Sequence, residues 1–355
     1  MNRVGQHVKA DCLPAINAFS AETLPPRRGR KTAPRTATVK GANPQEAGSS
    51  GTGARIILLI VVTLGLTIVA LARNSIYHED LRLWQDVIEK SPEKARPHYQ
   101  LGFYYDAAER YAEAIGEYQT ALRMGLNAGY DRAHNNLGSI YGKQGRFEEA
   151  IREYQAVLRY YPHDVAAHTN LGIIYAKQGR MNEALHEFQT AIQSDPNDAA
   201  AHYGLGNAYQ DQGRREEAMR EYQVTLQLKP DHAEARNNLG LLYGGLGRFP
   251  EAIREFQAAI NSKPESAEAY NNLGIVFAKQ GRYDEAIRAF QQALMHEPES
   301  AEAHKNIGIA YSYQGRLEAA MLEFQTALRI DPGHTGARSQ LEIVSRKLRG
   351  RKNVK

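Results

Sequence analysis

The chain has 355 residues, of which 24% are charged and 42% hydrophobic, a balance that excludes a wholly disordered protein. Its net charge of +4 is uneven, because residues 1–55 hold nine Lys and Arg against three Asp and Glu, and the rest hold 35 against 37. The single cysteine, Cys12, excludes an internal disulfide, so packing must supply the stability of any folded part.

Residues 1–53 are rich in Pro, Gly, Ser, Thr and Arg, which predicts a disordered basic N-terminal tail. A run of basic residues at Arg27–Lys31 resembles a localisation or nucleic-acid-binding patch. We favour a basic flank beside a membrane anchor over this reading, and we expect no nucleic-acid partner.

An apolar segment follows the tail, and we expect residues 54–73 to form a transmembrane helix. Ile56–Ala72 contains 17 residues without a charge, bracketed by Arg55 and Arg73. At about 1.5 Å per residue it spans about 25 Å, near the lower limit for a bilayer. A buried core helix would show a polar face, which this segment lacks.

The segment could also be a cleaved signal, since Ala70-Leu71-Ala72 fits the small-residue cleavage pattern. The preceding region is far longer than a signal peptide allows, which favours an uncleaved single span. The positive excess before it predicts a cytoplasmic N-terminus and an extracytoplasmic C-terminal part, periplasmic if the source is bacterial. The reverse topology is the remaining alternative.

The rest of the chain repeats one short sequence. Leu-Gly, or Ile-Gly once, recurs at residues 101–102, 137–138, 171–172, 205–206, 239–240, 273–274 and 307–308. The steps are 34 residues except the first, which carries two extra residues. Such a period is typical of a stacked array of helical repeats.

Each repeat is predicted to hold two helices. In the second repeat Gly145 separates two apolar runs and suits a left-handed helix end, and Pro162 stops the second helix. Asp164 is a suitable N-cap for the next helix. Gly138 and Ala150 allow the two helices to approach closely, and Tyr154 fills the space beside them.

This pattern resembles the tetratricopeptide repeat family. The family's motif residues in the third repeat are Leu171, Gly172, Tyr175, Ala184, Phe188, Ala191 and Pro196. The resemblance implies an all-α fold, a right-handed superhelical solenoid of seven repeats over 95–334. A helix in 80–92, within a 74–94 linker, and a helix in 335–355 are expected to cap its two ends.

The sequence contains no catalytic constellation, so we expect no enzymatic activity and no cofactor. Five histidines share one repeat position: His98, His134, His168, His202 and His304. Equivalent residues of adjacent repeats lie about 10 Å or more apart, whereas a zinc ion needs ligands at about 2 Å. We interpret them as packing residues and the many glutamates of the second helices as a solvated face.

An asparagine directly precedes the Leu-Gly pair in five repeats. We name these residues the asparagine ladder: Asn136, Asn170, Asn238, Asn272 and Asn306. Asn135, Asn237 and Asn271 precede three of them, and the ladder is interrupted at Gln100 and Gly204. The repeats look similar to those of O-linked N-acetylglucosamine transferase, where a comparable ladder holds extended peptides, which implies a peptide-binding role here. Structural hydrogen bonding between helices is the alternative.

Lys143, Lys177 and Lys279 recur near the end of the first helix and are further candidates for binding an acidic partner. We expect a membrane-anchored scaffold that binds an extended peptide or protein in the concave groove and supports assembly of a complex. The alternative is an accessory subunit or truncated relative of a membrane glycosyltransferase. The junction at 72–102 resembles the point where mannosyltransferase-like proteins enter tetratricopeptide tails.

Overall fold

The computed structural model describes residues 81–125 and 129–352, and these residues form helices and short turns. A helix covers residues 81–90 and is followed by fifteen more. They are α2 (Ala95–Ala107), α3 (Tyr111–Arg123), α4 (Tyr130–Lys143), α5 (Phe147–Tyr160), α6 (Val165–Lys177), α7 (Met181–Ser194), α8 (Ala199–Asp211), α9 (Arg215–Leu228), α10 (Ala233–Gly245), α11 (Phe249–Ser262), α12 (Ala267–Lys279), α13 (Tyr283–His296), α14 (Ala301–Tyr313), α15 (Leu317–Ile330) and α16 (Thr335–Lys352).

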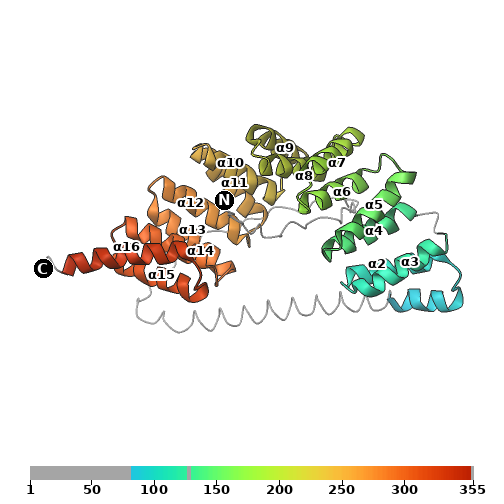
Figure 1. The fold of residues 1–355 in the computed structure, drawn as a ribbon, viewed down its shortest axis with the longest axis horizontal. Coiled ribbons are helices and arrows are strands. Elements are labelled where there is room, and N and C mark those ends of the chain that lie inside the picture. The colour runs from blue at the N-terminus through green and yellow to red at the C-terminus, as the bar shows by residue number, and fades with distance from the viewer. Residues whose placement is uncertain (1–80, 126–128, 353–355) are drawn as a thin grey trace, which may run out of the picture. The chain divides into compact units, whose positions relative to one another are not determined.

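The helices form an array of seven antiparallel pairs, each made of an even-numbered helix and the odd-numbered helix after it (Figure 1). Each odd-numbered helix also packs against the even-numbered helix of the next pair. The all-α repeat array expected from the sequence is therefore present. Because every pair contacts mainly its neighbours, the core is a continuous seam along the array.

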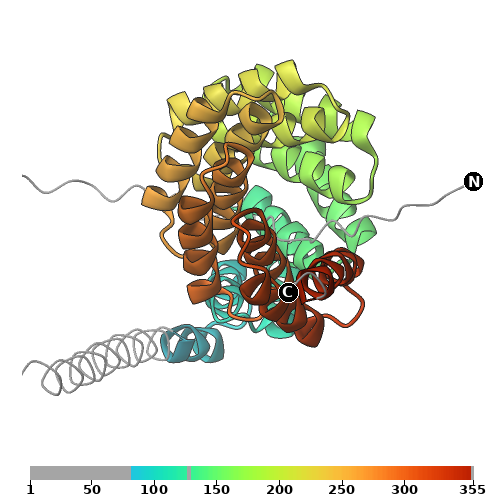
Figure 2. The same cartoon turned by 90° about the vertical axis from the view of Figure 1, so that its left-hand side faces the viewer.

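The two kinds of helix occupy different sides of a curved stack. Even-numbered helices of successive repeats contact one another, as α4 does α6 and α12 does α14, whereas odd-numbered helices of successive repeats stay further apart. A curved stack is shortest along its inner side, so the even-numbered helices form that side. The curvature of the repeats is visible in Figure 2. We call the solvent-facing surface of α2, α4, α6, α8, α10, α12 and α14 the inner wall.

The turns within the repeats confirm the prediction for Gly145, whose φ is +73°. Only glycine adopts this left-handed conformation without strain, and it lets the chain reverse between α4 and α5. The predicted caps are also present: the Asp164 carboxylate accepts a hydrogen bond from the Ala167 N–H at 2.7 Å.

The core of each pair forms where a glycine faces an aromatic ring. A Cβ added to Gly138 would lie 2.6 Å from Cε1 of Tyr154, so no other residue fits without displacing the ring. Tyr154 itself is buried, and burial raises the pKa of its hydroxyl. Gly138 on α4 and Tyr154 on α5 thus set the spacing of the two helices.

Neighbouring repeats are joined by a recurring polar bond. Gln119 of α3 donates to the Tyr141 hydroxyl of α4 at 3.1 Å, and Gln223 of α9 donates to that of Tyr243 at 3.2 Å. The same tyrosine carries an arginine on its ring face, with the Arg146 guanidinium 4.3 Å from the Tyr141 ring centroid. The recurring Gln, Tyr and Arg of the repeat motif therefore hold successive repeats together.

Both ends of the array are covered by an extra helix. In the helix at 81–90, Leu81 is buried, Trp84 and Ile88 pack on the core, and Gln85 donates to the Tyr105 hydroxyl at 3.2 Å. This helix therefore takes the place of an odd-numbered helix before α2. At the other end Val344 of α16 is buried against a cluster containing Phe324.

The expected tail, 1–53, and the expected transmembrane segment, 54–73, lie outside the described residues. Within 81–125 and 129–352, no helix has both the length and the apolar character that crossing a bilayer requires.

Candidate functional site

The asparagine ladder lies on the inner wall, in the middle of α4, α6, α10, α12 and α14. Each ladder residue is half-buried except Asn272, which is buried. Each sits beside the even-numbered helix of the preceding repeat and the aromatic core residue of that repeat. The partner of the asparagine amide differs from repeat to repeat.

In two of the three places where the preceding repeat offers a tyrosine, at Asn136 and Asn238, the amide reaches polar groups around the tyrosine hydroxyl. Asn136 Nδ2 donates to the Tyr118 hydroxyl at 3.0 Å. Asn238 Nδ2 donates to Asn207 Oδ1 at 3.0 Å and lies 3.4 Å from the Tyr222 hydroxyl. Burial raises the pKa of Tyr118, so this hydroxyl stays protonated and neutral.

Where the preceding repeat offers a phenylalanine, the amide bonds to another asparagine instead. Asn272 Nδ2 donates to Asn237 Oδ1 at 3.0 Å, and Asn306 Nδ2 donates to Asn271 Oδ1 at 3.1 Å. Each bond joins the even-numbered helices of successive repeats. The ladder nitrogens therefore serve the structure in both kinds of repeat.

The asparagines one residue earlier are engaged further. Asn237 is buried and donates to Glu268 Oε1 at 3.0 Å while its oxygen accepts from Asn272. Asn135 Nδ2 contacts the capping carboxylate of Asp164 at 3.5 Å, and its own oxygen is buried. For Asn135 and Asn237 the geometry favours the structural alternative, because little of either amide remains for a ligand.

The ladder oxygens differ from the nitrogens. Among the described residues no donor reaches the side-chain oxygen of Asn136, Asn272 or Asn306, and none of these oxygens is sealed from solvent. Asn170 forms no side-chain hydrogen bond within the described part of the chain, and it too is only half-buried. The inner wall therefore offers a row of carbonyl acceptors, of which those of Asn136, Asn272 and Asn306 are held in orientation by the bonds of their own nitrogens.

The break in the ladder at Gly204 has a packing cause. A Cβ at this position would lie 2.4 Å from Cε1 of Phe188, so the ring of the preceding repeat occupies the place of a side chain. The wall here carries Tyr203 and Asn207 instead, and the Asn207 oxygen accepts from Tyr222 at 2.7 Å and from Asn238. The fourth repeat thus interrupts the row of acceptors.

The three predicted lysines are exposed at the C-terminal ends of α4, α6 and α12. Lys143 lies 3.6 Å from the Asp106 carboxylate and 5.4 Å from the Tyr111 ring centroid, so it has structural partners. Burial raises the pKa of Asp106. Lys177 and Lys279 form no ion pair within the described ranges, which leaves their charges open to a ligand.

The sequence reasoning missed an apolar row on the same wall. The residue directly after the Leu-Gly or Ile-Gly pair is large and apolar in five repeats: Phe103, Ile173, Leu241, Ile275 and Ile309. Phe103 is 43% exposed and Leu241 40% exposed, and the other three are half-buried. The signal was the same 34-residue period that revealed the asparagines. Each residue of this row lies three positions, or about one helical turn, after the ladder position of its helix. The row therefore gives the inner wall an apolar component.

The five recurring histidines are not simple packing residues, and the glutamates opposite them are not on a solvated face. Each histidine Nδ1 bonds to a glutamate of the paired odd-numbered helix at 2.5 to 2.7 Å. These glutamates are Glu117, Glu153, Glu187, Glu221 and Glu323. The expectation of a solvated face is wrong for them, because burial beside a histidine offers each carboxylate a donor. In the described ranges no three His, Cys, Asp or Glu side chains are grouped to hold a metal ion.

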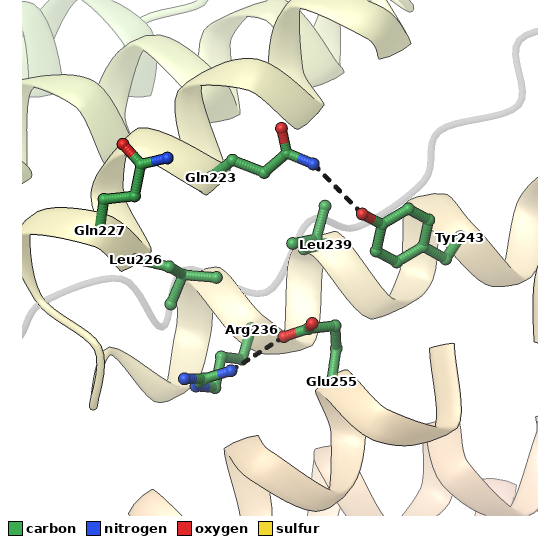
Figure 3. Close-up of a pocket in the computed structure, with 7 residues that line it drawn as sticks. All are labelled: Gln223, Leu226, Gln227, Arg236, Leu239, Tyr243 and Glu255. Atoms are coloured by element: carbon green, nitrogen blue, oxygen red, sulfur yellow. Dashed lines mark hydrogen bonds and ion pairs between the residues drawn. The ribbon is translucent and has the colours of Figure 1, made fainter. Parts of the chain in front are cut away.

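A hollow of about 310 Å³ lies between α9, α10 and α11 (Figure 3). Gln223, Leu226 and Gln227 of α9 line one side, and Leu239 and Tyr243 of α10 face them. The Arg236–Glu255 ion pair, at 3.0 Å, forms its edge. No ladder residue lines this hollow, so it is separate from the row of acceptors.

Comparison with known families agrees with this architecture. A family model described as the cilia and flagella-associated protein 70 C-terminal domain matches residues 162–352, more than half of the chain. Two tetratricopeptide repeat models match residues 94–156 and 138–179. The chain belongs to this family of tetratricopeptide repeat domains. Such domains bind peptide or protein partners, so the protein is a protein-binding scaffold.

Solved structures share the fold at low sequence identity. A tetratricopeptide repeat protein from Parabacteroides merdae matches with a TM-score of 0.52 and 19% identity, covering 74% of this chain and 98% of that one. The APC/C hetero-tetramer Cut9-Hcn1 gives 0.57 and 19%, covering 76% of this chain and 52% of that one, so the chain spans about half its length. Pseudomonas aeruginosa pilF gives 0.54 and 19%, covering 59% and 96%. A search of curated proteins found no match.

Proposed function

We propose that this tetratricopeptide repeat scaffold is anchored to a membrane and binds one extended peptide segment along its inner wall. The observation that carries the proposal is the row of ladder oxygens without a protein donor, on Asn136, Asn272 and Asn306. The family resemblance implies that the array is a right-handed superhelix. This course would keep the row continuous along the groove.

An extended peptide carries the matching chemistry. Its backbone N–H groups lack partners, and each can donate to an asparagine oxygen without any requirement on side-chain identity. Packed helices lie about 8–10 Å apart, and a polyproline II chain advances about 3.1 Å per residue, so about one contact per three ligand residues is expected. Many weak contacts along one partner then add to a useful affinity.

The fixed nitrogens make this arrangement favourable. Because the amides of Asn136, Asn272 and Asn306 are already held by a neighbour, little side-chain entropy is lost when a ligand binds their oxygens. The half-buried apolar row, with Phe103 and Leu241 most exposed, would accept apolar side chains of the same peptide. Lys177 and Lys279 would attract acidic residues near it.

The test is a fluorescent library of unstructured peptides titrated onto the full chain in detergent. Asn170→Ala is the cleanest single variant, since Asn170 has no side-chain bond to lose in the described part of the chain. The control is Asn182→Ala with Asn261→Ala, two exposed asparagines on the odd-numbered helices α7 and α11. We expect the peptides that bind the wild type to bind Asn170→Ala several-fold more weakly and the control unchanged. Equal affinity for all three proteins would refute the ladder.

The anchor is the second part of the proposal. Its support is the uncharged run Ile56–Ala72 and the positive excess before it, which favour a cytoplasmic N-terminus and repeats outside the cytoplasm. Protease added to cells with an intact inner membrane, after any outer membrane has been permeabilised, should digest the repeats and spare an N-terminal tag. Protection of the repeats, or release of the full chain by alkaline extraction, would count against this topology.

A further inference from the structure

Two of the recurring histidines face hydrogen-bond acceptors on both sides of the ring. His168 Nδ1 lies 2.6 Å from Glu187 Oε2, and its Nε2 lies 2.9 Å from the Pro162 carbonyl oxygen. His202 makes the equivalent contacts with Glu221 at 2.7 Å and the Pro196 carbonyl at 3.1 Å. A neutral imidazole has one N–H and would turn a lone pair toward one of these oxygens, whereas an imidazolium donates to both.

The fifth repeat carries a permanent cation in the same place. Arg236 Nη1 donates to Glu255 Oε2 at 3.0 Å (Figure 3), and its Nε donates to the Pro230 carbonyl at 2.9 Å. These two acceptors correspond to those of His168: the carbonyl oxygen of the proline six residues earlier in the chain, and a glutamate on the paired helix. An arginine side chain stays charged in proteins, so this site is built around a positive charge.

The sixth repeat shows the converse. Tyr270 stands at the histidine position, and the residue opposite is Ala289 rather than a glutamate. A glutamate is therefore present opposite the histidine or arginine of the other repeats, and it is absent opposite the tyrosine of this one. A buried carboxylate without a cation would be costly, which explains the joint change.

We propose that His168 and His202 act as protonation-dependent clamps. As imidazolium ions they join α6 to α7 and α8 to α9, and each also holds the proline turn that precedes its helix. Loss of the proton leaves one acceptor unsatisfied in each repeat and loosens the third and fourth repeats. These repeats are the centre of the inner wall.

The charged groups around the two rings are mainly acidic. His168 faces Glu187 of α7 and lies near Asp164, the cap of its own helix. Gln227 of α9 lines the hollow together with Arg236, and the residue at the same repeat position on α5 is Arg159. Arg159 is exposed. No charged side chain of α4 or α8 contacts the His168 ring within the described ranges.

His202 has a similar environment. It faces Glu221 of α9, and Asp198 caps its own helix. The residue of α7 equivalent to Arg159 is Gln193, which is uncharged, and no charged side chain of α6 or α10 contacts the ring in the described part of the chain. The proton on either ring is therefore balanced by carboxylates.

The direction of the pH effect follows for His168. Burial lowers the pKa of this imidazole, but the bonds to Glu187 and the Pro162 carbonyl outweigh it and leave the pKa raised. A raised pKa means that the folded state holds the proton more tightly than the unfolded state. The stabilisation is therefore complete below the ordinary value of about 6.5 and is lost as the pH rises through the raised value.

The test uses thermal unfolding of the full chain in detergent between about pH 5.5 and 8.5. The variant is His168→Arg with His202→Arg, which supplies the permanent cation that Arg236 shows to be compatible with the site. The control is His163→Arg with His186→Arg, two exposed histidines. We expect Tm of the wild type and the control to fall with rising pH, and the fall to be about half as large in the variant. An equal fall in all three proteins would overturn the proposal.

A second measurement does not depend on the variant folding. The ¹⁵N shifts of labelled histidines in the wild-type chain report the protonation of each ring nitrogen directly. Assignment uses the single variants His168→Gln and His202→Gln, in which one signal disappears. Both nitrogens of the His168 ring should be protonated at about pH 6.5, and a neutral tautomer of His168 at this pH would refute the clamp.

Discussion

Asn272 of α12 donates a hydrogen bond to Oδ1 of Asn237 on α10 at 3.0 Å, and both side chains are buried. We predict that Asn272→Ala destabilises the array by about 1–3 kcal/mol, because the Asn237 oxygen is left buried without a donor. Urea unfolding of the full chain, followed by circular dichroism, measures this change in the free energy of unfolding.

The matched control is Asn306→Ala, one repeat later. It removes the same bond, but its acceptor on Asn271 is half-buried, so water can replace the lost donor. We expect a smaller loss for Asn306→Ala than for Asn272→Ala. Equal losses would mean that burial of the acceptor does not set the cost.

The close approach at Gly204 gives a second prediction. Gly204→Ala places a Cβ 2.4 Å from Cε1 of Phe188, and relief requires the ring or the helix to move. We expect a loss of about 1–3 kcal/mol in the free energy of unfolding. The same substitution at Gly116 of α3, where no atom lies within 4 Å, should stabilise by about 0.5–1 kcal/mol. A neutral Gly204→Ala would show that the junction of α7 and α8 is loosely packed.

Acid stability depends on Glu234. Its hydrogen bond with His232, together with bonds to its backbone and Lys263, lowers the pKa of this carboxyl to about 2. A depressed pKa gives stabilisation that is present above the ordinary value and is lost as the pH falls through the folded value. We therefore expect the wild type to lose stability between about pH 4.5 and 2. In Glu234→Gln this loss should be smaller in urea titrations at successive pH values, and an unchanged acid profile would contradict the assignment.

A double-mutant cycle tests the joint identity of residues 270 and 289. Ala289→Glu alone adds a carboxylate at a buried position beside Tyr270 and should destabilise the array. Tyr270→His together with Ala289→Glu recreates the pair seen in five other repeats. We expect the two changes to be coupled favourably by about 1–3 kcal/mol in thermal or urea unfolding. Simple additivity would show that the two positions do not interact.

Much of the fold follows from residues whose role is local. Gly145 reverses the chain because the left-handed conformation is an intrinsic property of glycine, and Asp164 caps a helix through a bond to its own backbone three residues on. Neither depends on distant partners, so both could be predicted from the sequence. The 34-residue period then fixed the number and order of the helices.

The partners of the polar side chains depend on contacts between helices, and these were harder to predict. A ladder amide bonds to a hydroxyl at Asn136 and to another asparagine at Asn238 and Asn272, and this difference arises from contacts with the preceding repeat. The His168–Glu187 pair lies between two helices, and the two residues are separated by 19 positions. The sequence repeats this spacing of 19 positions, and Tyr270 and Ala289 differ together from the other repeats. Both signals can be interpreted only when the positions of the helices are known.

The bond from Gln85 to Tyr105 is the same one that links internal repeats, such as Gln223 to Tyr243. Boundaries that carry this glutamine and tyrosine are thus chemically alike, whereas the boundary before α12 has Phe277 in place of the tyrosine and no hydroxyl to accept the bond. Duplication or loss of a 34-residue unit between two boundaries of the first kind would preserve this bond. Arrays of different length, with binding walls of different reach, are therefore accessible to this lineage in single steps.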